Sequence, residues 1–265
     1  MPSCRKLALA ALAATAATAA NTAHATDFVA LTADSRLVAF DADSRRAGPA
    51  VAIRGIDGAV IGIDVRPADS MLYALSARSK LYTIDWRTGQ ASLVSTLDRM
   101  WDGGGRTVVD FNPAADRLRV IGMNGVSFRI NVETGAVTVD GSLKYDTGSA
   151  LAGSEPRVTA AAYRNSVAGA QQTGLYTIDT LAGSYNLQAP PNDGVQKPIM
   201  RLDVSLPPAS AFDIETVGEA NTGWILAGGQ LSRIDVATGN LRPVGGIANL
   251  PVNVEIIDIA VLPRR

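Results

Sequence analysis

The chain has 265 residues, of which 18% are charged and 47% are apolar, and its formal net charge at pH 7 is -1. This composition is typical of a globular protein and argues against a disordered chain. The near-neutral charge balance argues against nucleic acid as a partner and against electrostatic attachment to an anionic membrane.

Residues 1–25 have the features of a secretory signal peptide. Arg5 and Lys6 precede an uncharged, Ala-rich run, and Ala23-His24-Ala25 supplies the small-x-small pattern of a cleavage site. The run is shorter and less apolar than a membrane span, which needs roughly 20 apolar residues. The sequence therefore predicts a cleaved signal, a single mature domain of residues 26–265, a periplasmic or extracellular location and no membrane span.

Cleavage at this position would remove Cys4 and His24, the only cysteine and the only histidine of the chain. A mature protein without them has no disulfide, no thiolate nucleophile, no Ser-His-Asp triad and none of the usual zinc or copper ligand sets. Any metal would be hard and bound by oxygen. Acid–base chemistry would fall to Asp, Glu, Lys or Tyr.

The mature chain contains a repeated phrase in which an apolar strand is followed by Asp or Asn and then by Gly. Its copies are LVAFDADS at 37–44, LYTIDWRTG at 81–89, FRINVETG at 128–135, LYTIDTLAG at 175–183 and LSRIDVATG at 231–239. The Asp or Asn positions are spaced 44 to 56 residues apart. Alternating β-branched and aromatic residues predict a strand, and Asp-x-x-Thr-Gly predicts a tight hairpin turn.

A second repeated phrase precedes the first by about 25 residues. Its copies are IGIDVRP at 61–67, VVDFNP at 108–113, VTAAAY at 158–163, AFDIET at 211–216 and IIDIAVLP at 256–263. Further strands are predicted between the two phrases and after the glycine. Each unit then has four short antiparallel strands, which is the make-up of a propeller blade.

The two ends of the chain complement one another. Residues 254–262 contain a first strand only, whereas residues 27–53 contain the three later strands without a first. We therefore predict an all-β fold, a five-bladed β-propeller of four-stranded blades closed by pairing of the terminal strands. The other four blades are expected at 60–97, 107–143, 157–189 and 210–247, with 190–209 as a connection or lid. Asp140, Lys144, Tyr145 and Asp146 are expected in turns or on the surface, and 102–106 in a flexible loop.

The LYTID-x-x-TG repeat and the PPNDG motif at 190–194 resemble an exported bacterial domain-of-unknown-function family of propeller-like repeats. The hairpin alone is more distantly similar to quinoprotein-like propeller repeats. The resemblance covers essentially the whole mature chain and implies the propeller fold and export. It implies no activity and no catalytic residue.

The second phrase places an aspartate on the innermost strand of four blades. These residues are Asp64, Asp110, Asp213 and Asp258, and the fourth blade has Ala161 instead. Four carboxylates near one axis cannot all remain ionised in a low dielectric unless other groups compensate their charge. One interpretation is structural, with each carboxylate accepting backbone N–H groups to fix its own turn. The alternative is a shared cation bound through oxygen, most plausibly Ca²⁺.

The residues two positions further along differ from blade to blade, which is typical of contact with an asymmetric ligand. Candidate ligand-binding residues are Arg66, Asn112, Tyr163 and Glu215, with Ala260 in the remaining blade. This set would suit a sugar or a small acid. The function that we favour is therefore a non-catalytic, exported propeller that binds a small molecule, a glycan or an envelope protein, or acts as a scaffold.

The alternative is a His-free glycoside hydrolase or lyase that acts at the mouth of the central channel. Paired carboxylates can perform such chemistry without histidine. Glu215 with Asp64 or Asp110 would be the first candidates for the pair.

Overall fold

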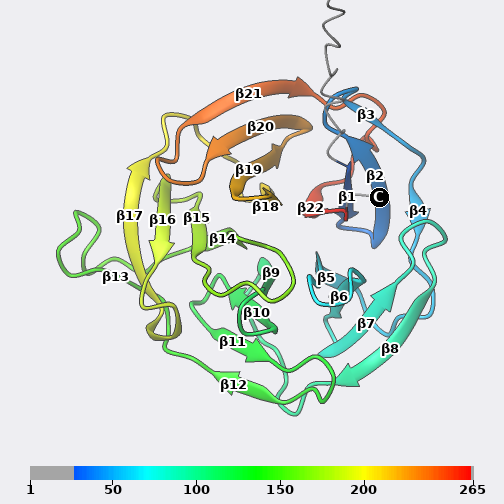
Figure 1. The fold of residues 1–265 in the computed structure, drawn as a ribbon, viewed down its shortest axis with the longest axis horizontal. Coiled ribbons are helices and arrows are strands. Elements are labelled where there is room, and N and C mark those ends of the chain that lie inside the picture. The colour runs from blue at the N-terminus through cyan, green and yellow to red at the C-terminus, as the bar shows by residue number, and fades with distance from the viewer. Residues whose placement is uncertain (1–26, 264–265) are drawn as a thin grey trace, which may run out of the picture.

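The computed structural model describes residues 27–263, which form five sheets around a central axis (Figure 1). The predicted five-bladed β-propeller is confirmed. The predicted signal peptide and its cleavage site lie outside the described residues. Within 27–263, the structure has no helix with the length and apolar character of a membrane span. The helical structure of this range is the short 3₁₀ turn η1 (Pro191–Asp193).

Blade 1 is built from both ends of the chain. Its innermost strand is β22 (Ile256–Val261), which pairs antiparallel with β1 (Asp27–Thr32). The chain continues into β2 (Arg36–Asp41), and the short strands β3 (Arg46–Ala47) and β4 (Val51–Ala52) both pair with β2. The predicted closure by the terminal strands is confirmed, so the ring has no free strand edge where it joins.

Blades 2, 3 and 5 each have four strands that run in chain order from the axis outward (Figure 1). Blade 2 consists of β5 (Val60–Val65), β6 (Leu72–Ser76), β7 (Lys80–Ile84) and β8 (Ala91–Thr96). Blade 3 consists of β9 (Thr107–Asn112), β10 (Arg117–Gly122), β11 (Ser127–Ile130) and β12 (Val137–Val139). Blade 5 consists of β18 (Ala211–Val217), β19 (Ala220–Ala227), β20 (Gln230–Asp235) and β21 (Leu241–Gly246).

Blade 4 has five strands and extends beyond its expected end. Its strands are β14 (Val158–Tyr163), β15 (Leu175–Asp179), β16 (Ser184–Gln188), β17 (Val195–Arg201) and, outermost and parallel to β17, β13 (Lys144–Tyr145). The expectation that 190–209 is only a connection or lid was wrong. The strand β17 contains Lys and Pro and is largely exposed. Its sequence therefore lacks the alternation of apolar and polar residues that usually indicates a strand.

The glycine of the repeated hairpin is required by contact with the preceding blade. Gly89 and Gly135 have φ of +75° and +74°, which favours glycine. A Cβ at Gly89 would lie 2.1 Å from the carbonyl oxygen of Ala52, and one at Gly135 would lie 2.0 Å from that of Thr96. At these two hairpins, the glycine therefore both closes the turn and lets two blades approach.

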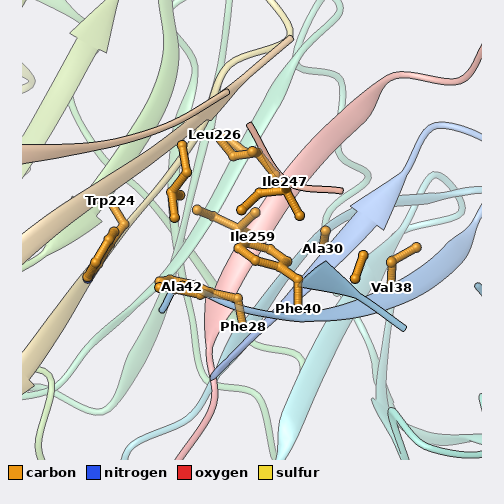
Figure 2. Packing of buried hydrophobic residues seen from close by; sticks show 12 residues of the cluster. Phe28, Ala30, Val38, Phe40, Ala42, Trp224, Leu226, Ile247 and Ile259 are labelled. Carbon is orange, nitrogen blue, oxygen red and sulfur yellow. The ribbon is translucent and has the colours of Figure 1, made fainter. Parts of the chain in front are cut away.

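The hydrophobic core lies between neighbouring blades. Between blades 5 and 1, Phe28 stacks on Phe40 at 4.8 Å and meets Trp224 edge-on at 5.4 Å, with Ile259 beside them (Figure 2). Each of the other four junctions has a buried apolar cluster of its own. These clusters fix the positions of the inner strands around the axis.

The junction between blades 3 and 4 also contains a buried polar network. Arg119 is fully buried and forms an ion pair with Asp140, while its Nη2 donates to Asn192 Oδ1 at 3.0 Å. The side chain of Asp140 is 4% exposed, and buried Tyr145 donates to Asp179 Oδ2 at 2.7 Å. The expectation that Asp140 and Tyr145 are turn and surface residues was wrong, because their partners come from other strands.

Candidate functional site at the propeller axis

The inner strands bring the four repeated aspartates together around the axis. Asp64, Asp110 and Asp213 lie on β5, β9 and β18 and are 5 to 6% exposed. Asp258, on β22, is less completely covered. Each carboxylate follows an apolar residue of the blade core, and the alternation of the strand turns it away from that core.

Each of these aspartates joins its own inner strand to the next blade. Asp258 accepts the N–H of Ile63 at 2.9 Å, and Asp64 accepts the N–H of Phe111 at 2.6 Å. In the same way, Asp110 accepts from Tyr163 at 2.9 Å, and Asp213 accepts from Val261 at 2.6 Å. The structural interpretation expected hydrogen bonds within the residue's own turn. The carboxylates instead link four of the five junctions, and three of them also accept the following N–H of their own strand.

The junction between blades 4 and 5, where Ala161 replaces the aspartate, has other hydrogen bonds. The loop 164–174 after β14 docks on blade 5, where the N–H of Asn165 donates to Asn221 Oδ1 at 2.7 Å. The N–H of Ser166 donates to Thr216 Oγ1 at 2.8 Å. The blade without the axial carboxylate therefore contributes a loop to the end of the channel.

Three of the carboxylates converge. One oxygen each of Asp64, Asp110 and Asp213 lie within 4.8 Å of one another. Burial, and then the neighbouring Asp213, raise the pKa of Asp64 well above its usual value, and burial and Asp64 do the same for the pKa of Asp110. Burial raises the pKa of Asp213 to about 6. The three groups therefore resist simultaneous ionisation unless a cation or protons compensate them.

The convergent carboxylates have no basic partner. No Lys or Arg in the described part of the chain forms an ion pair with Asp64, Asp110 or Asp213. Their hydrogen bonds come from main-chain N–H groups, as in the N–H of Tyr163 that donates to Asp110 Oδ1 at 2.9 Å. Buried charges in proteins are normally paired, hydrogen-bonded or metal-bound.

A pocket of about 300 Å³ opens above Asp64 and Asp213, at the end of the channel where the inner strands finish. Glu215, Ser70 and Thr216 contribute polar groups to it. Its apolar lining comes from Val65, Val167, Ala168, Ile214, Val261 and Leu262, with Pro67 and Pro263. Among residues 27–263, no Lys or Arg lines this pocket. The end of the channel at which these strands finish is called the mouth below.

The opposite end of the channel contains Arg106, which the sequence analysis did not select. Its Nη2 reaches across the axis from blade 3 and donates to the carbonyl oxygens of Ile257 at 2.7 Å and Ser210 at 3.3 Å. Its Nε and Nη1 are buried and have no hydrogen-bond partner among residues 27–263. Burial lowers the pKa of Arg106, and nearby Asp258 opposes that shift. Arg106 lies four residues before Asp110, so strand alternation could have placed it on the axial side.

The structure separates the four residues expected to bind ligand. Glu215 lines the mouth pocket, where its Oε2 accepts from Trp224 Nε1 at 3.2 Å. Arg66 instead forms ion pairs with Asp69, Asp116 and Glu133. The hydrogen bond with Asp116, followed by those with Tyr73 and Glu133, raises the pKa of Arg66.

The other two expected residues contact groups of the protein: Asn112 in its own turn and Tyr163 across the junction with blade 3. Asn112 Oδ1 accepts the N–H groups of Ala114 and Ala115 at 3.0 and 2.9 Å. Tyr163 is 2% exposed, and its hydroxyl accepts from Arg119 Nε at 3.2 Å. Burial raises the pKa of Tyr163. Of the four candidates, Glu215 is therefore the one that faces the mouth pocket.

The family model described as Domain of unknown function (DUF4394) matches residues 36–260, a range that includes all four axial aspartates. The chain belongs to this family. The family resemblance expected from the repeats is thus confirmed. No functionally curated protein matches the sequence.

This DUF4394 chain is similar to several solved structures. A structural genomics protein of unknown function from Bacteroides thetaiotaomicron VPI-5482 is 15% identical with a TM-score of 0.52, over 90% of this chain and 65% of that one. The chain thus spans about two thirds of that protein. The Myceliophteria thermophila Cps50 (Swd1) β-propeller domain is 11% identical with a TM-score of 0.45, over 82% and 67% of the two chains. The first of these likenesses shows the fold alone.

Proposed function

We propose that this DUF4394 propeller is a non-catalytic, exported binding module that holds a small, hydroxyl-rich molecule in the mouth pocket. The observation that carries the proposal is the pocket itself. It is an axial cavity of about 300 Å³ with carboxylates at its foot and an apolar wall. Small-molecule sites typically combine such a concave apolar surface with a few converging polar groups.

The lining of the pocket defines the chemistry of the ligand. Asp64, Asp213 and Glu215 offer hydrogen-bond acceptors, and Ser70 and Thr216 offer hydroxyls. Among residues 27–263, the charged groups that line the pocket are carboxylates, which disfavour a free anion. Arg66, which would have suited a small acid, is already paired with three carboxylates. A neutral saccharide or polyol fits these groups better than a small acid does.

The hydrogen bonds of the carboxylates support binding over hydrolysis. A retaining glycosidase also has carboxyl groups about 5 Å apart, so the spacing of the axial aspartates alone would suit one. However, one oxygen of Asp64 and one of Asp213 accept a main-chain N–H of the next blade, and the other oxygen of each accepts the N–H of the following residue. A nucleophile or general acid in this position would have to give up contacts that hold the ring together.

The ligand proposal is tested by blocking the pocket. A panel of neutral sugars and polyols is screened by thermal shift, and calorimetry measures the affinity of each hit for the wild type, Val167→Trp and Val252→Trp. Val167 lines the pocket and is 43% exposed, so an indole can fill the space without displacing the core. Val252 is 82% exposed and precedes β22, away from the mouth, which makes it the matched control.

We expect hits whose affinity falls at least about tenfold in Val167→Trp and is unchanged in Val252→Trp. A panel without hits, or equal affinity in both variants, would overturn the proposed site. Binding of amines in place of sugars would overturn the ligand class. Release of product from chromogenic glycosides, lost in Glu215→Gln, would establish the hydrolase alternative.

Export is tested separately. The basic start, the apolar run and the Ala23-His24-Ala25 pattern support it. We expect protein expressed from the full sequence in a Gram-negative host to be recovered from the periplasm or the medium with Thr26 as its first residue. Recovery from the cytoplasm with the leader intact would contradict export and leave the ligand proposal standing.

A further inference from the structure

We propose that blade 5 carries an anion site, separate from the mouth pocket, in which Arg233 and Arg242 bind a phosphate or sulfate group. The site is a pocket of about 280 Å³ on the strands β19, β20 and β21 (Figure 1). The described linings of this pocket and the mouth pocket have no residue in common. The polar residues that line it are Arg233, Arg242, Asp235, Thr222, Asn221 and Asn240.

The two arginines stand directly opposite one another on adjacent strands. Arg233 of β20 is the register partner of Arg242 of β21, so both side chains lie on the same face of the blade. Like charges placed directly opposite in a sheet repel one another. An anion placed between them replaces this repulsion with two attractions. Both side chains are exposed, so a ligand reaches them without displacing the core.

Residues 27–263 supply no ion-pair partner to this pair. None of the ion pairs within that range involves Arg233 or Arg242. The acid in the described lining is Asp235, whose Oδ1 accepts the N–H groups of Ala237 and Thr238 and the Thr238 hydroxyl. The hydrogen bonds with Thr238, more than the charge of Arg242, lower the pKa of Asp235. Asp235 therefore closes its own hairpin and leaves the two guanidinium groups to an external anion.

Arg233 is held in place before any ligand binds. Its guanidinium carbon lies 4.5 Å from the centroid of the Trp224 ring. Trp224 is 1% exposed, meets Phe28 edge-on at 5.4 Å and donates from Nε1 to Glu215 Oε2. A guanidinium fixed on a rigid indole loses less side-chain entropy when it binds an anion. This second observation distinguishes Arg233 from a mobile surface arginine.

The number of donors indicates a tetrahedral oxyanion. A carboxylate has two oxygens, which the fork of one guanidinium engages completely. A phosphate or sulfate group has three or four oxygens and can accept a fork from each arginine. The hydroxyl of Thr222 and the amide of Asn240 belong to the same lining and offer further donors. A free anion and an ester of a small molecule present the same oxygens, so the experiment compares the two.

The experiment measures anion binding by calorimetry at low ionic strength, in a buffer without phosphate. Inorganic phosphate, sulfate, glycerol 3-phosphate and acetate are titrated into the wild type, Arg242→Gln and Arg87→Gln. Arg242→Gln removes one charge of the pair and leaves Arg233 on the ring of Trp224. Arg87→Gln is the matched control. Arg87 is also exposed and lies 4.0 Å from the centroid of the Trp86 ring, but it is in the turn after β7 and has no strand partner.

We expect one phosphate per chain and tighter binding of phosphate and sulfate than of acetate. The affinity for phosphate should fall at least about tenfold in Arg242→Gln and stay unchanged in Arg87→Gln. Binding of glycerol 3-phosphate at least as tight as that of phosphate would support an ester as the ligand, and weaker binding would support the free anion. Absence of phosphate binding to the wild type, equal affinities of the two variants, or acetate binding as tight as phosphate binding would overturn the proposal.

A second measurement uses the wild type and does not depend on the affinity of a variant. The Nε–H NMR signals of Arg233 and Arg242, assigned with Arg233→Gln and Arg242→Gln, should shift when phosphate is added, whereas that of Arg87 should not. Shifts confined to other arginines would overturn the assignment. Because none of these titrations contains a neutral sugar, the anion site can fail while the pocket-blocking test succeeds, and the reverse.

Discussion

The two ends of the central channel carry opposite charges, although both are built by the same repeated strand. At the mouth, Asp64, Asp213 and Glu215 face a pocket to which residues 27–263 contribute no basic side chain. At the other end, Arg106 crosses the axis to carbonyl oxygens of blades 1 and 5. The channel is thus polarised, with an acidic end that opens on a pocket and a basic end where a guanidinium lies across the ring.

The difference shows how a repeat protein makes an asymmetric site. The aspartate that recurs on the inner strands forms the contacts between blades, and it is the same in four of five units. The chemistry of each end comes from residues that occur once, such as Arg106 before β9 and Glu215 on β18. The repeated residue holds the ring, and the unrepeated ones distinguish its two ends.

The largest effect that we expect is a fall in stability with rising pH, centred on Asp258. Burial raises its pKa from the usual 3.8 to about 8; Arg106 lowers the pKa, and Asp213 raises it. Asp64 and Asp110 also face this group. A carboxyl with a raised pKa in the folded state contributes stability that is complete below pH 3.8 and is lost as the pH rises through about 8. The slope for one group is at most about 1.4 kcal/mol per pH unit.

Denaturant titrations in EDTA between pH 5 and 9 measure this slope as a change in the free energy of unfolding. In Asp258→Asn the slope should be smaller, and the remainder should come from Asp64, Asp110 and Asp213. Asp43→Asn, which removes an exposed carboxylate in the β2–β3 turn, should reproduce the wild-type slope. Equal slopes for wild type and Asp258→Asn would show that Asp258 is ionised throughout this range.

A smaller loss of stability is expected when one of the axial aspartates that join neighbouring blades is replaced. Asp213→Ala leaves the N–H groups of Ile214 and Val261 without their acceptor, at about 1–3 kcal/mol for each buried group. Relief of repulsion from Asp64 and Asp110 offsets part of that cost, so we expect a net loss of about 2 kcal/mol. Asp213→Asn, which keeps one acceptor oxygen, should lose less. Chemical denaturation measures the free energy of unfolding of both variants. If Asp213→Ala were as stable as the wild type, the hydrogen bonds of Asp213 would add nothing to the stability of the ring.

The fold could be predicted from the sequence because each blade repeats a local pattern. The alternation of LYTID at 81–85 and the Asp-x-x-Thr-Gly turn are local signals, and the complementary ends at 27–53 and 254–262 indicate closure directly. The prediction of the fourth blade was incomplete because β17 and β13 lack such a pattern. Their pairing depends on contacts between segments about 50 residues apart.

The candidate site was predictable only in the part that repeats. Asp64, Asp110 and Asp213 follow from the common phrase, and the structure brings their oxygens together. Arg66 is removed from the mouth by Asp116 and Glu133, acids from loops of blade 3 that no spacing connects to it. Arg106 was missed because it was assigned to the flexible glycine loop 102–106. Counting back by two residues from Asp110 would have placed it on the axis.

The smallest effect that we expect comes from removing the guanidinium of Arg106, at the end of the channel opposite the mouth. Arg106→Met deprives the carbonyls of Ile257 and Ser210 of a donor, but it also removes two buried nitrogens that have no partner. These changes largely cancel, and we expect a loss of about 1 kcal/mol or less in the free energy of unfolding. The clearer readout is the pKa of Asp258, which should rise because Arg106 is the cation that lowers it. Carboxyl carbon NMR over the pH range measures that shift, with exposed Arg54→Met as the control. An unchanged Asp258 titration in Arg106→Met would mean that the two ends of the channel are electrostatically independent.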